Sequence, residues 1–165
     1  MDQSQMIKVL SGHRTFAGVE ADSWSQFIEA AQFVSFNPGE VVYEKSQPCD
    51  AGYILIGGRL ELIDEPYPGR RLSTQIFSAG NLFSEGGFIK QWPHRRRCTA
   101  LETTDVLKIS CDSFKEVVES GNAVALCVID RLLDAFVLEV EAANQRLDEI
   151  YARPDRTLAR LMSSN

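Results

Sequence analysis

The chain has 165 residues, of which 44% are hydrophobic and 24% charged, and its formal net charge is −6. This composition is typical of one ordinary globular domain with an appended helix, and it excludes a disordered chain. An acidic chain is a poor general nucleic-acid binder, and no apolar run approaches the roughly 18 residues of a membrane span.

The cysteines indicate a reducing compartment. The four of them stand far apart in the sequence, and no two form a C-x-x-C pair: Cys49, Cys98, Cys111 and Cys127. This spacing favours free thiols over a disulfide framework or a metal cluster. We therefore expect a cytoplasmic protein.

The first 35 residues are predicted to be helical. An apolar stripe recurs there at steps of three and four residues: Trp24, Phe27, Ile28, Ala31 and Val34. Asp22 or Ser23 is the expected N-cap of this helix. The pattern indicates a helix that packs on a larger core.

A series of short strands follows the turn at Pro38-Gly39. The predicted strands are 41–43, 52–56, 59–63, 72–77 and 105–109, and Gly57-Gly58 is expected to form a tight hairpin. Short strands with a turn every 8–12 residues or so are typical of an antiparallel sandwich or barrel. The sequence thus predicts a β-roll.

The segment from Gly80 to Ala100 interrupts the strands with an expected anion cradle. Its glycines let a backbone turn expose N–H groups, a short helix can start there, and His94 and three arginines follow. Backbone donors at a helix start with guanidinium groups nearby suit a phosphate. The alternative is that the basic run lies on a solvated face.

The C-terminal part is predicted to be helical again. Ser113 is the expected cap of a helix up to Glu119. A heptad seam then runs through a long helix that Pro154 ends: Leu126, Ile129, Leu133, Phe136, Val140, Ala143, Leu147 and Ile150. The seam predicts a homodimer, with packing inside one chain as the alternative because Leu132 and Val137 widen the stripe.

With these elements in this order, the sequence resembles a cyclic nucleotide-binding domain of the Crp/Fnr (catabolite activator) type. The framework matches are Pro38–Val42 and Gly52–Leu60. The resemblance implies a mostly β fold: an antiparallel double-stranded β-helix like a cupin jelly roll, with flanking helices and a long C-terminal dimerisation helix. The expected domains are 1–120 for the roll with its N-terminal helices, 121–153 for the dimerisation helix, and 154–165 for the start of a further helix.

The resemblance also implies a ligand site, whose expected residues are Phe83, Ser84, Glu85, Gly86, His94, Arg95 and Arg96. In the family, a Phe-Gly-Glu segment and a later arginine hold the ribose and the cyclic phosphate. Here Ser84 stands at the position of that glycine, and counting from Pro93 or Ala100 puts His94 at the position of that arginine. Arg95 is one residue late, and a bulge could bring it into register.

Two functional interpretations follow from this cassette. A regulatory domain with a degenerate cassette is expected to bind cyclic AMP weakly or not at all and to act as a dimeric signalling or interaction module. The alternative is a genuine receptor for cyclic AMP or cyclic GMP within a truncated Crp/Fnr-family transcription regulator. A different small anion in the same cradle also remains open.

Other chemistries find less support in the sequence. A cupin-like metalloenzyme needs several convergent histidine and carboxylate ligands, and the chain has only His13 and His94. No spacing motif supports haem ligation or a Cys–His nucleophile pair. Without such motifs we expect no enzymatic activity. Only 11 residues follow Pro154, which are too few for a helix-turn-helix, so we expect no DNA binding by this chain.

Overall fold

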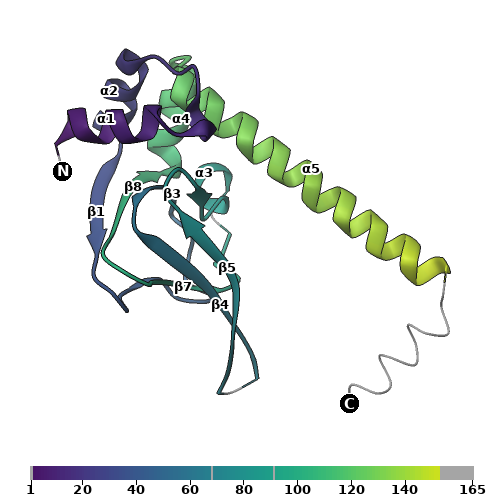
Figure 1. Ribbon diagram of the computed structural model, residues 1–165. Coiled ribbons are helices and arrows are strands. Elements are labelled where there is room, and N and C mark those ends of the chain that lie inside the picture. Colours follow the sequence, from purple (N-terminus) through teal and green to yellow (C-terminus); the bar gives the residue numbers. More distant parts are fainter. Residues whose placement is uncertain (1, 68, 91, 153–165) are drawn as a thin grey trace. The chain divides into compact units, whose positions relative to one another are not determined.

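A computed structural model of the chain describes residues 2–67, 69–90 and 92–152 (Figure 1). The chain divides into two compact units, with the boundary between Val128 and Ile129. All the strands named below lie in the first unit. The expected domain limits stay a prediction, and residues 154–165 lie outside the described part of the chain.

Two four-stranded antiparallel sheets form a β-roll. One sheet has the order β1 (Gln32–Phe36), β8 (Thr104–Ser110), β3 (Ala51–Gly57), β6 (Leu82–Phe83), and the other has the order β2 (Val41–Tyr43), β7 (Arg97–Ala100), β4 (Arg59–Tyr67), β5 (Arg70–Ser78). Side chains alternate along each strand, so that Cys98 and Ala100 are buried in the core while Arg97 and Thr99 are only half-buried. The predicted antiparallel β-roll is confirmed.

The predicted hairpin at Gly57-Gly58 is wrong. Strands β3 and β4 belong to different sheets, so this turn carries the chain from one sheet to the other. The hairpin joins β4 and β5 instead, with Tyr67 opposite Arg70. A pair of glycines marks a turn, but it does not specify whether the strands on either side pair with each other.

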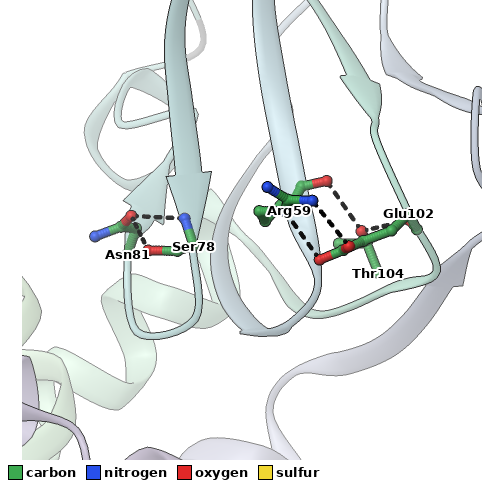
Figure 2. Close-up of polar contacts among 5 residues, drawn as sticks. All are labelled: Arg59, Ser78, Asn81, Glu102 and Thr104. Carbon is green, nitrogen blue, oxygen red and sulfur yellow. Dashed lines mark hydrogen bonds and ion pairs between the residues drawn. The ribbon is translucent and has the colours of Figure 1, made fainter.

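Hydrogen bonds and an ion pair of side chains stabilise the turns where β4 begins and β5 ends (Figure 2). The Arg59 guanidinium contacts the Glu102 carboxylate through two N–O pairs at 3.2 and 3.3 Å, and the Thr104 hydroxyl donates to the Arg59 carbonyl at 3.2 Å. Beside them, the Ser78 N–H donates to the Asn81 side-chain carbonyl at 2.8 Å. Asn81 thereby turns the chain from β5 into β6, which leads into the candidate site.

Helices precede, interrupt and follow the strands. They are α1 (Gln3–Ser11), the 3-10 turn η1 (Arg14–Phe16), α2 (Ala21–Glu29), α3 (Gly86–Ile89), α4 (Cys111–Glu119) and α5 (Ala123–Ala152). Figure 1 shows α1, α2 and α4 gathered at one end of the roll. The Trp24 ring is buried there, edge-on to Phe16 at 4.9 Å between centroids.

The helical prediction for the first 35 residues needs correction at its end. Residues 32–36 form β1, because pairing with β8 gives their backbone a ladder of hydrogen bonds and buries part of their apolar side chains. Two caps also differ from the prediction. The N-cap of α2 is Glu20, and that of α4 is Ser110, whose hydroxyl accepts from the Ser113 N–H.

The predicted long C-terminal helix is confirmed as α5. The Asn122 side-chain carbonyl accepts hydrogen bonds from the N–H groups of Val124 and Ala125, at 3.0 and 3.2 Å, and so caps its first turn. The predicted stop at Pro154 lies outside the described residues. Among the helices in residues 2–67, 69–90 and 92–152, none is both long and apolar enough to span a bilayer.

Gly87 is expected to be essential for the packing of α3. A Cβ at this position would overlap the Ala51 carbonyl, a backbone group that cannot swing aside. We predict that Gly87→Ala lowers the free energy of unfolding by about 1–3 kcal/mol, measured by urea denaturation at fixed protein concentration. Gly57→Ala is the matched control, because a Cβ there meets open space. Equal effects of the two substitutions would contradict this prediction.

Candidate functional site

The candidate site begins where β6 passes into α3. Strand β6 pairs with β3, with Phe83 opposite Tyr53, and Ser84 and Glu85 then lead into α3. Ser84 is 7% exposed and has φ 59°, in the left-handed region that non-glycine residues rarely adopt. The structure therefore brings four of the expected site residues together in one turn: Phe83, Ser84, Glu85 and Gly86.

The Ser84 side chain points into the protein. Its hydroxyl donates to the Ala51 carbonyl at 2.9 Å and lies 3.0 Å from the Cys49 sulfur. Burial raises the pKa of the Cys49 thiol, and the hydrogen bond with Ser84 opposes that shift. The serine therefore ties the turn to the start of β3 through neutral groups.

Aromatic side chains fill the roll next to this turn. The Phe83 ring is fully buried, stacked against Tyr53 at 4.9 Å and tilted against Phe77 at 5.6 Å between centroids. Burial raises the pKa of Tyr53 to about 12. The phenol is thus neutral at physiological pH, and the interior at this point holds large uncharged groups.

His94 is positioned by Tyr43 and by the loop after β2. Its ring stacks on the Tyr43 ring with 3.6 Å between centroids and 6° between planes. The backbone N–H of His94 donates to the Gln47 carbonyl at 2.9 Å, and the backbone carbonyl of His94 accepts from the Ser46 N–H at 2.7 Å. Both backbone groups of His94 are therefore occupied, and its ring lies flat against a buried phenol.

The environment of His94 favours the neutral imidazole. Desolvation by burial lowers the pKa of His94 below its ordinary value, and the Asp50 carboxylate opposes this shift without reversing it. Tyr43, on which the ring stacks, and Cys98, which contacts Tyr43, are neutral too: burial raises the pKa of Tyr43 far above its ordinary value and that of Cys98 to about 12. At neutral pH, His94 therefore favours its uncharged form.

The three consecutive arginines lie in different surroundings. Arg95 and Arg96 form an exposed bend before β7, whereas Arg97 begins the strand and its Nε lies 3.5 Å from the Glu44 carboxylate. The register shift between β2 and β7 falls between Val41 and Tyr43, on the partner strand. In this structure neither Arg95 nor Arg96 joins the buried cluster around Phe83 and Ser84.

Sequence reasoning missed Tyr43, Cys49 and Asp50, which contact or influence the cassette from the β2–β3 region. Tyr43 carried one signal, since it ends a short strand whose alternation points it inward. Cys49 and Asp50 carried none, because their nearness to Ser84 and His94 depends on the folding of distant segments.

The lowered pKa of His94 predicts a pH dependence of stability. Because the folded state disfavours the protonated imidazole, His94 contributes stability above the unfolded-state pKa of about 6.5 and loses it as the pH falls below that value. We expect the free energy of unfolding of the wild type to fall more steeply than that of His94→Gln between about pH 7 and pH 5. Urea denaturation across this range measures both slopes, and parallel slopes would contradict the assignment.

Comparison with known proteins supports this fold. The sequence model of the family described as "Cyclic nucleotide-binding domain" matches residues 33–120. A CRP-like cAMP-activated global transcriptional regulator of Mycobacterium tuberculosis is 24% identical over 145 residues, which are 88% of this chain and 63% of that protein. The chain thus spans less than two thirds of the length of the curated relatives it matches.

Solved structures agree with the fold. The catabolite activator protein of Thermus thermophilus superimposes with a TM-score of 0.70 at 16% identity, over 83% of this chain and 62% of that one. The N-terminal domain of a transcriptional regulator from Streptomyces coelicolor gives a TM-score of 0.67 at 18% identity, over 82% and 94%. Because this family model matches more than half of the chain, the chain belongs to the cyclic nucleotide-binding domain family, and the relatives that it resembles are CRP-like and catabolite activator proteins.

Proposed function

We propose that this chain is a regulatory domain whose phosphate cassette is degenerate, so that it binds cyclic AMP weakly or not at all and acts as a dimeric signalling or interaction module. The observation that carries the proposal is that Ser84 and His94, at the two positions that the family resemblance assigns to the phosphate, are both engaged with the protein itself.

Ser84 is poorly suited to the role of the family's glycine. Its backbone has the positive φ that a glycine adopts freely, but its Cβ and hydroxyl occupy space beside the turn. The hydroxyl is directed to the Ala51 carbonyl and the Cys49 thiol. A phosphate that approaches the backbone here would meet a side chain where the family's glycine leaves room.

His94 is a weak substitute for the family's arginine. Removing one partner of a buried, hydrogen-bonded charge pair costs about 2–5 kcal/mol, which is roughly 30-fold to several-thousand-fold in affinity. A neutral imidazole stacked on Tyr43 replaces little of that energy. We therefore expect the phosphate to gain no strong charge-assisted bond from this position.

A genuine cyclic nucleotide receptor is the second candidate. One observation favours it: Arg95 and Arg96 are exposed, and neither forms an ion pair with another residue of the described ranges. A guanidinium without a competing partner is free to turn toward a ligand. The M. tuberculosis relative is itself named as cAMP-activated, which is consistent with this candidate.

Dimerisation through α5 is part of the proposal. Six of the eight seam residues are large apolar side chains that are exposed in the single chain: Leu126, Leu133, Phe136, Val140, Leu147 and Ile150. Soluble monomers rarely leave so long an apolar stripe in water, and a sustained heptad seam favours a second copy of the same helix. We propose a homodimer through this seam.

We also infer that the domain is not an enzyme and works in the cytoplasm. Its relative is a transcription regulator, and the four cysteines are free thiols, as expected in a reducing compartment. The ligand-linked movement that the family resemblance implies would act through the dimer.

Calorimetric titration with cyclic AMP and cyclic GMP tests the degenerate cassette. We expect no micromolar binding by the wild type. The double substitution Ser84→Gly with His94→Arg should raise the affinity by about 30-fold or more, because it restores the backbone approach and the guanidinium. The control Ser84→Gly with His94→Gln should gain little. Micromolar binding by the wild type, or no gain in the double variant, would overturn the proposal.

A charge placed in the α5 seam should separate the dimer. We predict that Leu133→Glu lowers the dimer mass measured by sedimentation equilibrium to that of the monomer at micromolar concentration, since a carboxylate would be buried in the seam. Leu138→Glu is the matched control, because Leu138 is exposed on the same helix but lies outside the seam. A dimer that withstands the first change, or one that both changes disrupt equally, argues against this interface.

A further inference from the structure

The segment between α3 and β7 carries three exposed cations and an exposed tryptophan, and we name these residues the cationic loop: Lys90, Trp92, Arg95 and Arg96. We propose that the cationic loop is a docking surface for an acidic, partly apolar segment of a partner protein. The inference rests on the proposed function in one respect, namely that Arg95 and Arg96 are not occupied with a ligand phosphate inside the roll.

The charge of the loop contrasts with that of the chain. No aspartate or glutamate occurs between Glu85 and Glu102, although the chain as a whole has a formal net charge of −6. Arg97, the next residue along the chain, differs because its guanidinium forms an ion pair with Glu44. Within the described ranges, Arg95 and Arg96 have no such ion pair and are exposed. Their charges are available to a partner.

Trp92 adds an apolar surface to these charges. It is 58% exposed, whereas the other tryptophan of the chain is fully buried. The Lys90 ammonium lies over the Trp92 ring, 5.7 Å from its centroid, so the aromatic face and a cation are next to each other. Tryptophan and arginine are enriched among the residues that dominate the energy of protein–protein interfaces.

The loop is anchored at both ends. On one side, the Phe88 ring is buried edge-on to Phe114 at 4.9 Å, and the Lys90 N–H donates to the Gly86 carbonyl at 2.8 Å. On the other side, His94 is fixed by its backbone bonds and by its stacking on Tyr43. Anchoring lowers the entropy lost when a loop orders on binding. A partner would therefore bind the cationic loop at a lower entropy cost than it would bind an unanchored loop.

The charges favour an acidic protein segment over a nucleic acid. Sequence-independent binding to a nucleic-acid backbone comes from lysine and arginine contacts with many phosphates, and the loop offers three cations on a chain whose formal net charge is −6. A short acidic segment needs only a few. An apolar side chain within that segment would contact Trp92, which a phosphate backbone cannot do in the same way.

The test uses the full chain and a synthetic peptide of alternating glutamate and leucine, followed by calorimetry and by the fluorescence of Trp92. We expect binding that weakens between about 50 and about 300 mM salt. Arg95→Glu with Arg96→Glu, and Trp92→Ala separately, should each lower the affinity at least about tenfold. The matched control is Arg70→Glu with Arg71→Glu, the same change of charge at two exposed arginines of β5, and it should change the affinity less than about threefold.

Each alternative outcome overturns the proposal. These are no detectable binding of the peptide at low salt, an equal loss in the Arg70 and Arg71 control, or tighter binding of a single-stranded oligonucleotide or anionic vesicle through the same residues. Circular dichroism checks that the variants fold. Titration of the wild type and of the Arg95 and Arg96 variant with cyclic AMP distinguishes the docking surface from the proposed function. If the wild type binds cyclic AMP and the variant does not, the degenerate cassette is contradicted, even if the wild type also binds the peptide.

Discussion

The close contact between the cassette and the first residues of β3 determines the structure of the site. Ser84 turns inward at positive φ and bonds to the Ala51 carbonyl, and Gly87 lets α3 approach that same carbonyl. A left-handed residue costs about 1–2 kcal/mol and a buried hydrogen bond returns about 0.5–1.5 kcal/mol. The two terms nearly cancel, so the packing of α3 against β3 determines the position of the cassette.

The groups that pack near this contact favour their neutral forms. A serine, a thiol and aromatic rings surround the turn, and burial removes water from Tyr43, Cys98 and His94. The loss of hydration raises the pKa values of Tyr43 and Cys98 and lowers that of His94, so that each group favours its neutral form. The Arg95 and Arg96 side chains of the same segment remain exposed to water. Buried groups in their neutral forms thus lie in the same part of the chain as the exposed Arg95 and Arg96, and the proposed functions depend on this arrangement.

The sequence predicted what local patterns encode. The heptad seam gave α5 because periodicity repeats over the whole helix, and Phe83 to Gly86 were found together because they are contiguous. The pairing of β4 was predicted wrongly, because Gly57-Gly58 indicates a turn but does not indicate whether the two flanking strands belong to the same sheet. Tyr43 and Cys49 were missed because Tyr43 reaches Phe83 and His94, and Cys49 reaches Ser84, from segments that are distant in the sequence. Contacts between distant segments depend on the complete fold.

The core also decides which of the three arginines is structural. Cys98 and Ala100 point inward from β7, and this register places Arg97 on the outer side, where Glu44 meets it. A slip of one residue would exchange the two faces and turn Arg97 and Thr99 toward the core, at a cost of several kcal/mol for the unpaired charge alone. Packing thus holds the strand start at Arg97. Arg95 and Arg96 remain outside the strand because two small buried side chains fix its register.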